Sequence, residues 1–156
     1  MARPAEAGSA NPPSESRNHP MILSRFLKPK WQHADPETRK QALRELENTD
    51  PTLRELARQD PDPSVRRAGL ERLGDLDLLG LIAREDNDTG VRAAAAERYR
   101  ALLAGQVAGG PALADRLERL RRESDTELTA YLLRHATEPE LRLTLLERIE
   151  TEYMSM

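Results

Sequence analysis

Apolar residues recur every three or four positions in short segments along most of the chain, and polar punctuation separates the segments. This period is typical of amphipathic helices rather than of strands, in which apolar and polar positions alternate. An Asp stands directly before a Pro at residues 35, 50 and 62, which is the order of a helix N-cap and a first helical residue. The pattern predicts helices near residues 36–47, 51–59, 63–73, 76–85, 89–104, 111–122, 125–135 and 138–152.

Several of these predicted helices share their opening residues. The segments DPETRKQALREL, DPSVRRAGLERL, DTGVRAAAAERY and EPELRLTLLERI each begin with an acid that is followed four positions later by an Arg. The repeated Arg residues are Arg39, Arg66, Arg92 and Arg142, at spacings of 27, 26 and 50 residues, and a Gly-rich loop at 104–110 stretches the third unit. Such self-similarity indicates stacked helix pairs. We expect an all-α solenoid, a right-handed superhelix of antiparallel helix pairs.

Each repeated Arg falls inside the apolar stripe of its helix when positions are placed at about 100° per residue. A guanidinium group on a packing face needs a partner, because an unpaired buried charge is costly. Acids stand four residues earlier in every unit, and stacked helices lie roughly 8–10 Å apart, within reach of the next unit. The sequence therefore predicts an acid–Arg ladder that consists of Asp35, Arg39, Asp62, Arg66, Asp88, Arg92, Glu138 and Arg142. Alternatively, the same Arg residues bind phosphates or an acidic partner.

Residues 62–73 follow the pattern D-P-x-[VL]-R-x-A-x-L-x-x-L, which resembles the first helix of HEAT repeats. The resemblance covers residues 35–150, although the period is shorter than the ~40–47 residues usual for HEAT units. More narrowly, FLKPKWQHADPETRKQALREL (26–46) resembles the opening of the bacterial family named for domain of unknown function 349. In that family HEAT-like units precede charged helical repeats. The resemblance implies a scaffold without established activity, and a repeat domain at 35–156 that continues beyond the chain end.

The segments before the repeats have a different composition. Residues 1–20 are rich in Pro, Ala, Ser and Asn without an apolar period, which predicts a disordered tail. Met21 then opens a more apolar stretch, and one hypothesis is that it is the natural start. We interpret 21–34 as an N-terminal cap that carries a basic and aromatic cluster. This candidate binding cluster consists of Arg25, Lys28, Lys30 and Trp31.

The cap cluster has two interpretations. Its bases and its Trp could bind phosphate and stack on a nucleobase. We favour the alternative that Phe26, Leu27 and Trp31 cover the first helix pair while the bases stay in water. Two interpretations also exist for the Arg residues of LADRLERLRRESD, at positions 116, 119, 121 and 122. We favour a solvated helix face over a strip that binds a partner.

The composition restricts the possible chemistry. There is no Cys, which excludes disulfides, thiolate zinc sites and Cys nucleophiles. The three His residues are scattered, and neither a Gly-x-Ser-x-Gly elbow nor a phosphate loop occurs. With five aromatic residues, an aromatic-lined pocket for a small-molecule substrate is not expected. We expect no enzyme activity, no cofactor, no metal and, since no apolar run reaches membrane length, a soluble cytoplasmic protein.

The predicted function is a non-catalytic scaffold that binds a protein partner through a groove lined by the second helices of the pairs. Those helices include Leu53–Arg58 and Leu79–Arg84, which makes Arg58 and Arg84 candidate binding residues. The formal charge of −3, with acids and bases interspersed, argues against a bulk nucleic-acid binder. This charge is still compatible with a local basic face. The alternative function is therefore a nucleic-acid-binding module similar to the DNA glycosylases built from HEAT-like repeats. A tetrapyrrole enzyme similar to bilin lyases is a more distant third.

Overall fold

The computed structural model describes residues 28–156, and within this range every regular element is a helix. The predicted tail at 1–20 and Arg25 lie outside the described residues. The all-α prediction is confirmed for the described part of the chain, where the eight expected helices are found with boundary shifts of a few residues. The elements are η1 (Lys30–Gln32), α2 (Pro36–Glu45), α3 (Pro51–Gln59), α4 (Pro63–Leu70), α5 (Leu76–Glu85), α6 (Thr89–Leu103), α7 (Leu113–Arg122), α8 (Thr126–His135) and α9 (Pro139–Met154).

Aspartate caps set the starts of most helices. In six of them the N-cap carboxylate accepts a hydrogen bond from a backbone N–H of the first turn, which satisfies a donor that has no partner within the helix. Pro follows the cap in α2, α3, α4 and α9, where its fixed φ suits the first turn and its missing N–H costs nothing. The six capping residues are Asp35, Asp50, Asp62, Asp75, Asp88 and Asp125.

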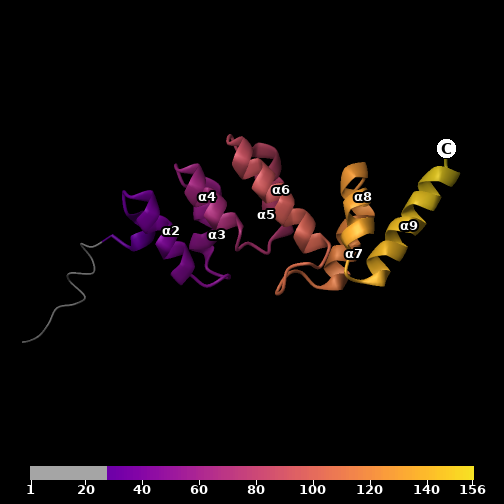
Figure 1. Cartoon of the computed structure of the whole chain (residues 1–156), viewed down its shortest axis with the longest axis horizontal. Coiled ribbons are helices and arrows are strands. Elements are labelled where there is room, and N and C mark those ends of the chain that lie inside the picture. The colour runs from indigo at the N-terminus through magenta and orange to yellow at the C-terminus, as the bar shows by residue number, and fades with distance from the viewer. Residues whose placement is uncertain (1–27) are drawn as a thin grey trace, which may run out of the picture.

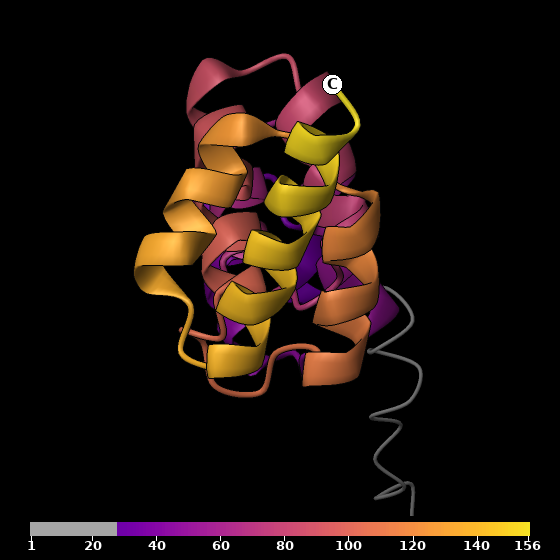
Figure 2. The same ribbon diagram turned by 90° about the vertical axis from the view of Figure 1, so that its right-hand side faces the viewer.

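The helices follow one another along the long axis of the molecule, from α2 at one end to α9 at the other (Figure 1). Helices α2, α4 and α6 pack side by side, while α3 packs on α4 and α5 packs on α6. Near the C-terminus α8 contacts both α6 and α9, and α7 contacts α9. Viewed from this end, α9 lies between α7 and α8 (Figure 2). Most packing is therefore between elements that are close in the sequence.

A continuous apolar core runs through this row of helices and is built mainly from Leu. Residues from each of α2 to α9 contribute to this one cluster. Helices α3 and α4 approach each other closely. A Cβ atom on Gly69 would lie 3.0 Å from the Cα atom of Ala57, so the absence of a side chain allows these two backbones to meet.

The regular alternation is broken between α6 and α7. No helix occupies the sequence between them, and residues 104–112 form a loop instead, as expected for the Gly-rich stretch. Gly105 and Gly109 have φ angles of 76° and 73°, a left-handed conformation that Gly adopts without a steric penalty. Helix α7 then begins at Leu113, two residues later than predicted.

The structure also shows how the repeat continues across this loop. Arg116 stands four residues after the N-cap of α7, the same position that Arg39, Arg66, Arg92 and Arg142 occupy in their helices. It lies 24 residues after Arg92 and 26 before Arg142, so the 50-residue spacing contains two units. We call α2, α4, α6, α7 and α9 the ladder helices, and α3, α5 and α8 the second helices. Each second helix packs with the ladder helix that follows it, as α3 with α4, α5 with α6 and α8 with α9, and each such pair forms a unit. No helix lies between α6 and α7, so the unit that ends with α7 lacks its second helix.

In residues 28–156 no helix is both long and apolar enough to cross a membrane. The same range contains no cluster of three or more His, Asp or Glu side chains arranged to hold a metal ion. Helix α9 exposes five large apolar side chains, Leu143, Leu146, Ile149, Tyr153 and Met154.

Candidate structural ladder and binding surface

Arg39 is the first buried guanidinium of the repeat. Its Nε and Nη2 atoms donate to the two carboxylate oxygens of Asp60, at 2.8 and 3.0 Å. Its Nη1 atom donates to the carbonyl oxygens of His33 and Ala34, at 2.8 and 2.9 Å. The side chains of Arg39 and Asp60 are only 10% and 1% exposed. Helix α2 is thus tied both to the loop before it and to the end of α3.

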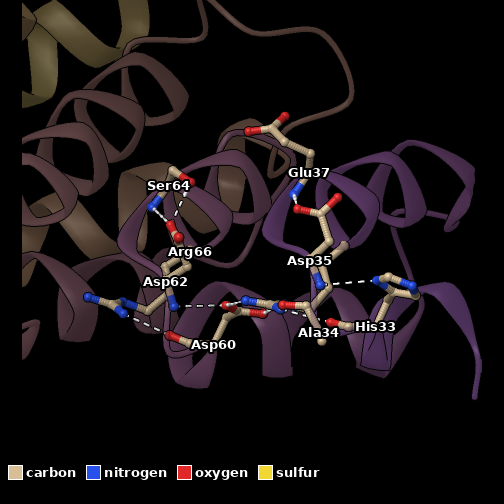
Figure 3. A network of polar contacts seen from close by, with 9 residues as sticks. His33, Ala34, Asp35, Glu37, Asp60, Asp62, Ser64 and Arg66 are labelled. Carbon is tan, nitrogen blue, oxygen red and sulfur yellow. Dashed lines mark hydrogen bonds and ion pairs between the residues drawn. The ribbon is translucent and has the colours of Figure 1, made fainter.

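Arg66 repeats this arrangement one unit later. Its Nε and Nη2 atoms donate to the Asp86 carboxylate at 2.9 and 3.1 Å, and Nη2 also donates to Asn87 Oδ1. Its Nη1 atom donates to the backbone carbonyl of Asp60 at 2.7 Å. The carboxylate of Asp60 therefore accepts hydrogen bonds from Arg39, and its backbone carbonyl accepts one from Arg66 (Figure 3, where Asp60, Asp62 and Arg66 are labelled).

The chain of contacts continues through Asp86, whose carbonyl oxygen accepts from Arg92 Nη1 at 2.6 Å. Burial alone raises the pKa of the Asp86 carboxyl, but the hydrogen bonds from Arg66 and from the Asp88 N–H outweigh it, so the pKa lies below its ordinary value. The carboxylate is therefore the form that the folded state prefers. Three successive units are joined in this way by one network, Arg39–Asp60–Arg66–Asp86–Arg92.

The acids assigned to the ladder from the sequence are wrong for this part of the chain. Asp35, Asp62 and Asp88 accept from backbone N–H groups of their own helices, for example from Ser64 at 2.7 Å and from Val91 at 2.9 Å. An N-cap carboxylate lies over the end of its own helix, which leaves it turned away from the preceding unit. The acid that faces the preceding unit stands two residues earlier, at the C-cap of a second helix.

The predicted inward placement of the last two Arg residues is also not found. Arg92 is only partly buried and has no carboxylate partner among residues 28–156, because Gly110 stands six residues before Arg116, where a side chain equivalent to Asp60 would be needed. Arg142 is exposed and makes no hydrogen bond or ion pair with any residue from 28 to 156. Within these residues α9 ends the row, so no further unit offers Arg142 an acid.

Arg116, for which the sequence pattern favours a solvated face, is instead buried, with 6% of its surface exposed. It forms a bidentate contact with the Glu138 carboxylate, with Nη1 at 3.0 Å from Oε2 and Nη2 hydrogen-bonded to Oε1. It also donates to the carbonyl oxygens of Leu103 and Pro111. A second ladder segment therefore joins α7 to α9 across the start of the last unit.

Glu138 pairs with Arg116 because this unit has no acid at the position that Asp60 and Asp86 occupy in theirs. Ala136 stands six residues before Arg142, where Asp60 and Asp86 stand in their units. The longer Glu138 reaches back from the N-cap position, and α9 consequently has no side-chain N-cap hydrogen bond. Gly105 makes room for the pair, since a Cβ atom there would lie 2.6 Å from Arg116 Nη1.

Glu138 gives this part of the fold a defined pH dependence. The hydrogen bond from Arg116 is the largest cause that lowers its pKa from 4.5 to about 2, against an opposing effect of burial. Because the pKa of Glu138 is lower in the folded state, its ionised carboxylate stabilises the fold above pH 4.5. This contribution disappears as the pH falls from 4.5 towards 2. We expect Glu138→Gln to lower the free energy of unfolding by about 2 kcal/mol at pH 7 and by progressively less below pH 4.5.

Urea denaturation of wild type and Glu138→Gln at pH 7, 5, 4 and 3 measures this difference. A difference that stays constant over the series would show that the carboxylate charge of Glu138 does not stabilise the fold. Glu140→Gln on the same helix is the matched control, because Glu140 is exposed and has no side-chain partner within residues 28–156.

The candidate binding residues of the second helices lie on the surface. Arg58 and Arg84 occupy the last turns of α3 and α5, and Arg134 holds the same place in α8. All three are exposed, and none forms an ion pair with an acid of the described chain. We call Arg58, Arg84 and Arg134 the arginine row.

The cap cluster is only partly visible in the described range. Trp31 is half-buried and packs against the core, and Lys30 forms an exposed ion pair with Glu45 at 2.8 Å. Lys28 is exposed. These three residues lie as the interpretation of a covering Trp and solvated bases expects, whereas Phe26 and Leu27, on which it also depends, lie outside the described residues.

Comparison of the chain with protein-family models, with curated proteins and with solved structures gives no match. The functional proposal therefore rests on the contacts within the chain itself.

Proposed function

We propose that this chain is a non-catalytic scaffold, a short HEAT-like solenoid that binds an acidic segment of a protein partner on the surface of its second helices. The Arg–acid network supports the solenoid, because the same Arg joins one unit to the next at Arg39, Arg66 and Arg116. Stacking of this kind produces an extended surface suited to binding. The right-handed sense of the superhelix and a cytoplasmic location belong to the same proposal.

The arginine row is the observation that carries the binding proposal. Arg58, Arg84 and Arg134 recur at one position of each second helix, and each presents a guanidinium group to solvent without a carboxylate of the described chain. Leu81 and Tyr131 are partly exposed one turn earlier on α5 and α8. Guanidinium groups bind carboxylates in bidentate fashion, and the apolar surface beside them suits a peptide with mixed acidic and apolar side chains.

Charge reversal of the row tests the proposal. The variant Arg58→Glu/Arg84→Glu/Arg134→Glu is compared with a matched control, Arg44→Glu/Arg67→Glu/Arg142→Glu, which reverses three exposed Arg residues of the ladder helices. Both variants change the net charge equally. Quantitative affinity purification from cells that naturally make the protein is expected to lose partner proteins at least about tenfold with the first variant and less than about twofold with the control.

Equal retention of every partner by both variants would contradict the proposal. A nucleic-acid function is the other outcome of the test. It predicts that a DNA of about 20 nucleotides binds at micromolar concentration, and that this binding weakens steeply between about 50 and 200 mM salt and disappears in the row variant.

A further inference from the structure

A notch in the molecular surface lies where the unit ending with α7 lacks its second helix. Its volume is about 390 Å³, and its walls come from α5, α6, α7 and the start of α8. In the preceding unit α5 packs on α6, whereas the loop 104–112 stands where a helix would pack on α7. A volume of this size lies within the range of protein ligand sites.

The floor of the notch is made of small residues that leave space. Gly80, Ala83 and Ala96 line it together with the ring of Tyr99. Gly80 aligns with Arg54 of α3, so a side chain is possible at this position of a second helix but is absent in α5. Side-chain atoms of Arg84, Tyr99 and Arg119 border the empty Cβ position of Gly80 at 3.6, 3.8 and 3.9 Å.

Guanidinium groups converge on this floor. The Cβ position of Gly80 lies 3.6 Å from Arg84 Nη1 and 3.9 Å from Arg119 Nη2, which brings the two cations to the same point of the surface. Arg100 also lines the notch, with its guanidinium 5.4 Å from the centre of the Tyr131 ring. Neither Arg84 nor Arg100 has a carboxylate partner within the described part of the chain.

The acids around the notch are largely engaged elsewhere. Glu123 accepts from the Tyr99 hydroxyl at 3.1 Å, and Asp125 caps α8 by accepting from the Glu127 N–H at 2.8 Å. Arg119 is held in place by Tyr99, to whose hydroxyl it donates at 2.8 Å, and by Asp77. The lining holds three Arg and three acidic side chains, and its formal charges balance. Glu123 and Asp125 accept from neutral donors, and neither Arg84 nor Arg100 forms an ion pair within residues 28–156, so the guanidinium donors of these two Arg are available to a bound carboxylate.

We infer that the notch anchors an acidic side chain of the protein partner, whose carboxylate binds Arg84 and Arg100 while an adjacent apolar side chain covers Ala83 and Leu128. This inference rests on the proposed scaffold function and names the point where the partner is held most firmly. The two unpaired guanidinium groups support it, because Arg84 and Arg100 line one small cavity and neither forms an ion pair within residues 28–156. An anchor of this kind contributes more binding energy than exposed contacts at the rim.

The test uses a defined probe, a fluorescein-labelled peptide of Glu, Leu and Ser with a length of about ten residues, and fluorescence anisotropy of the full chain is the readout. The same peptide with Gln in place of every Glu is its control. Gly80→Met fills the notch and Arg100→Gln removes one cation. Gly80→Ala adds a single methyl group at ordinary contact distance and is the matched control variant.

We expect Kd to rise at least about tenfold in Gly80→Met and in Arg100→Gln, and to stay within about twofold in Gly80→Ala. Circular dichroism melts of the variants establish that each is folded. Failure of the acidic peptide to bind wild type, or equal binding of the Gln peptide, overturns the inference. Unchanged binding by the folded Gly80→Met variant also overturns it, as does tighter binding of a short DNA or of inorganic phosphate.

The two proposals fail in different ways. If the row variant loses its partners while the acidic peptide binds the notch variants as tightly as wild type, the scaffold stands and the notch is not its anchor. If the row variant keeps every partner, the scaffold function itself is wrong.

Discussion

Asp60→Ala is expected to lower the free energy of unfolding by about 3–5 kcal/mol, far more than the loss of any exposed ion pair of this chain. The Asp60 carboxylate is 1% exposed and receives both Nε and Nη2 of Arg39 as well as the backbone N–H of Asp62. The large effect arises because the substitution leaves a buried guanidinium group without a counter-charge. Urea denaturation monitored by circular dichroism measures the change.

Asp62→Ala is the matched control, because the two acids are separated by one Pro and only their roles differ. Asp62 caps α4, and loss of a cap costs about 1 kcal/mol. Equal destabilisation by the two substitutions would contradict the assignment of Asp60 to the network.

Gly69→Val is expected to destabilise the fold by about 3 kcal/mol, because it inserts a branched side chain where α3 and α4 touch. The Cβ atom alone would lie 3.0 Å from the Cα and Cβ atoms of Ala57, and Ala57 is fully buried. The strain cannot be relieved by rotating a flexible side chain, since the atoms in the way belong to a backbone and its first carbon. Helix α4 must move away from α3.

The contrasting substitution is Gly80→Ala, which changes a glycine in the middle of α5. Its Cβ atom would meet side-chain atoms at 3.6 Å or more, so the gain in helix propensity is expected to stabilise the fold by about 0.5–1 kcal/mol. Thermal melts of both variants, read as opposite shifts in Tm, check the pair. A neutral Gly69→Val would show that the α3–α4 contact is looser than these distances indicate.

The helices are predictable from the sequence because their signals are local. An Asp before a Pro satisfies a helix N-terminus through side chains only two or three residues apart, so the starts of α2, α3 and α4 follow from adjacent residues. The sequence pattern extends α4 three residues too far, since the apolar period continues to Leu73 although the backbone leaves the helix after Leu70.

The partners of the ladder are harder to predict because they depend on which way a carboxylate faces. Asp60 and Asp62 stand in the same Asp-Pro-Asp-Pro stretch, and only the capping role of Asp62 separates them. A signal is present nonetheless: an acid stands six residues before Arg66 and again before Arg92. The repeat pattern does not reveal Arg116, because Ala112 stands four residues before it, where each of the other units has an acid.

The notch is not predictable from the sequence at all. It results from the absence of one helix and from the tertiary position of α8, which contacts α6 as well as α9. Of the residues that line it, Arg84 is a binding candidate by its sequence because of its place on a second helix, and Arg119 is one only in the less favoured interpretation of its helix as a binding strip. Neither is predicted from the sequence to line a cavity.

The central claim is that buried Arg–acid pairs join successive units, and a double-mutant cycle on Arg66 and Asp86 tests it most directly. The single variants Arg66→Ala and Asp86→Ala and the double variant are compared with wild type by urea denaturation at pH 7. The account predicts a coupling energy of about 2 kcal/mol or more, as expected for a bidentate pair whose side chains are 9% and 5% exposed. A coupling energy under about 0.5 kcal/mol, the range of exposed pairs, would contradict it.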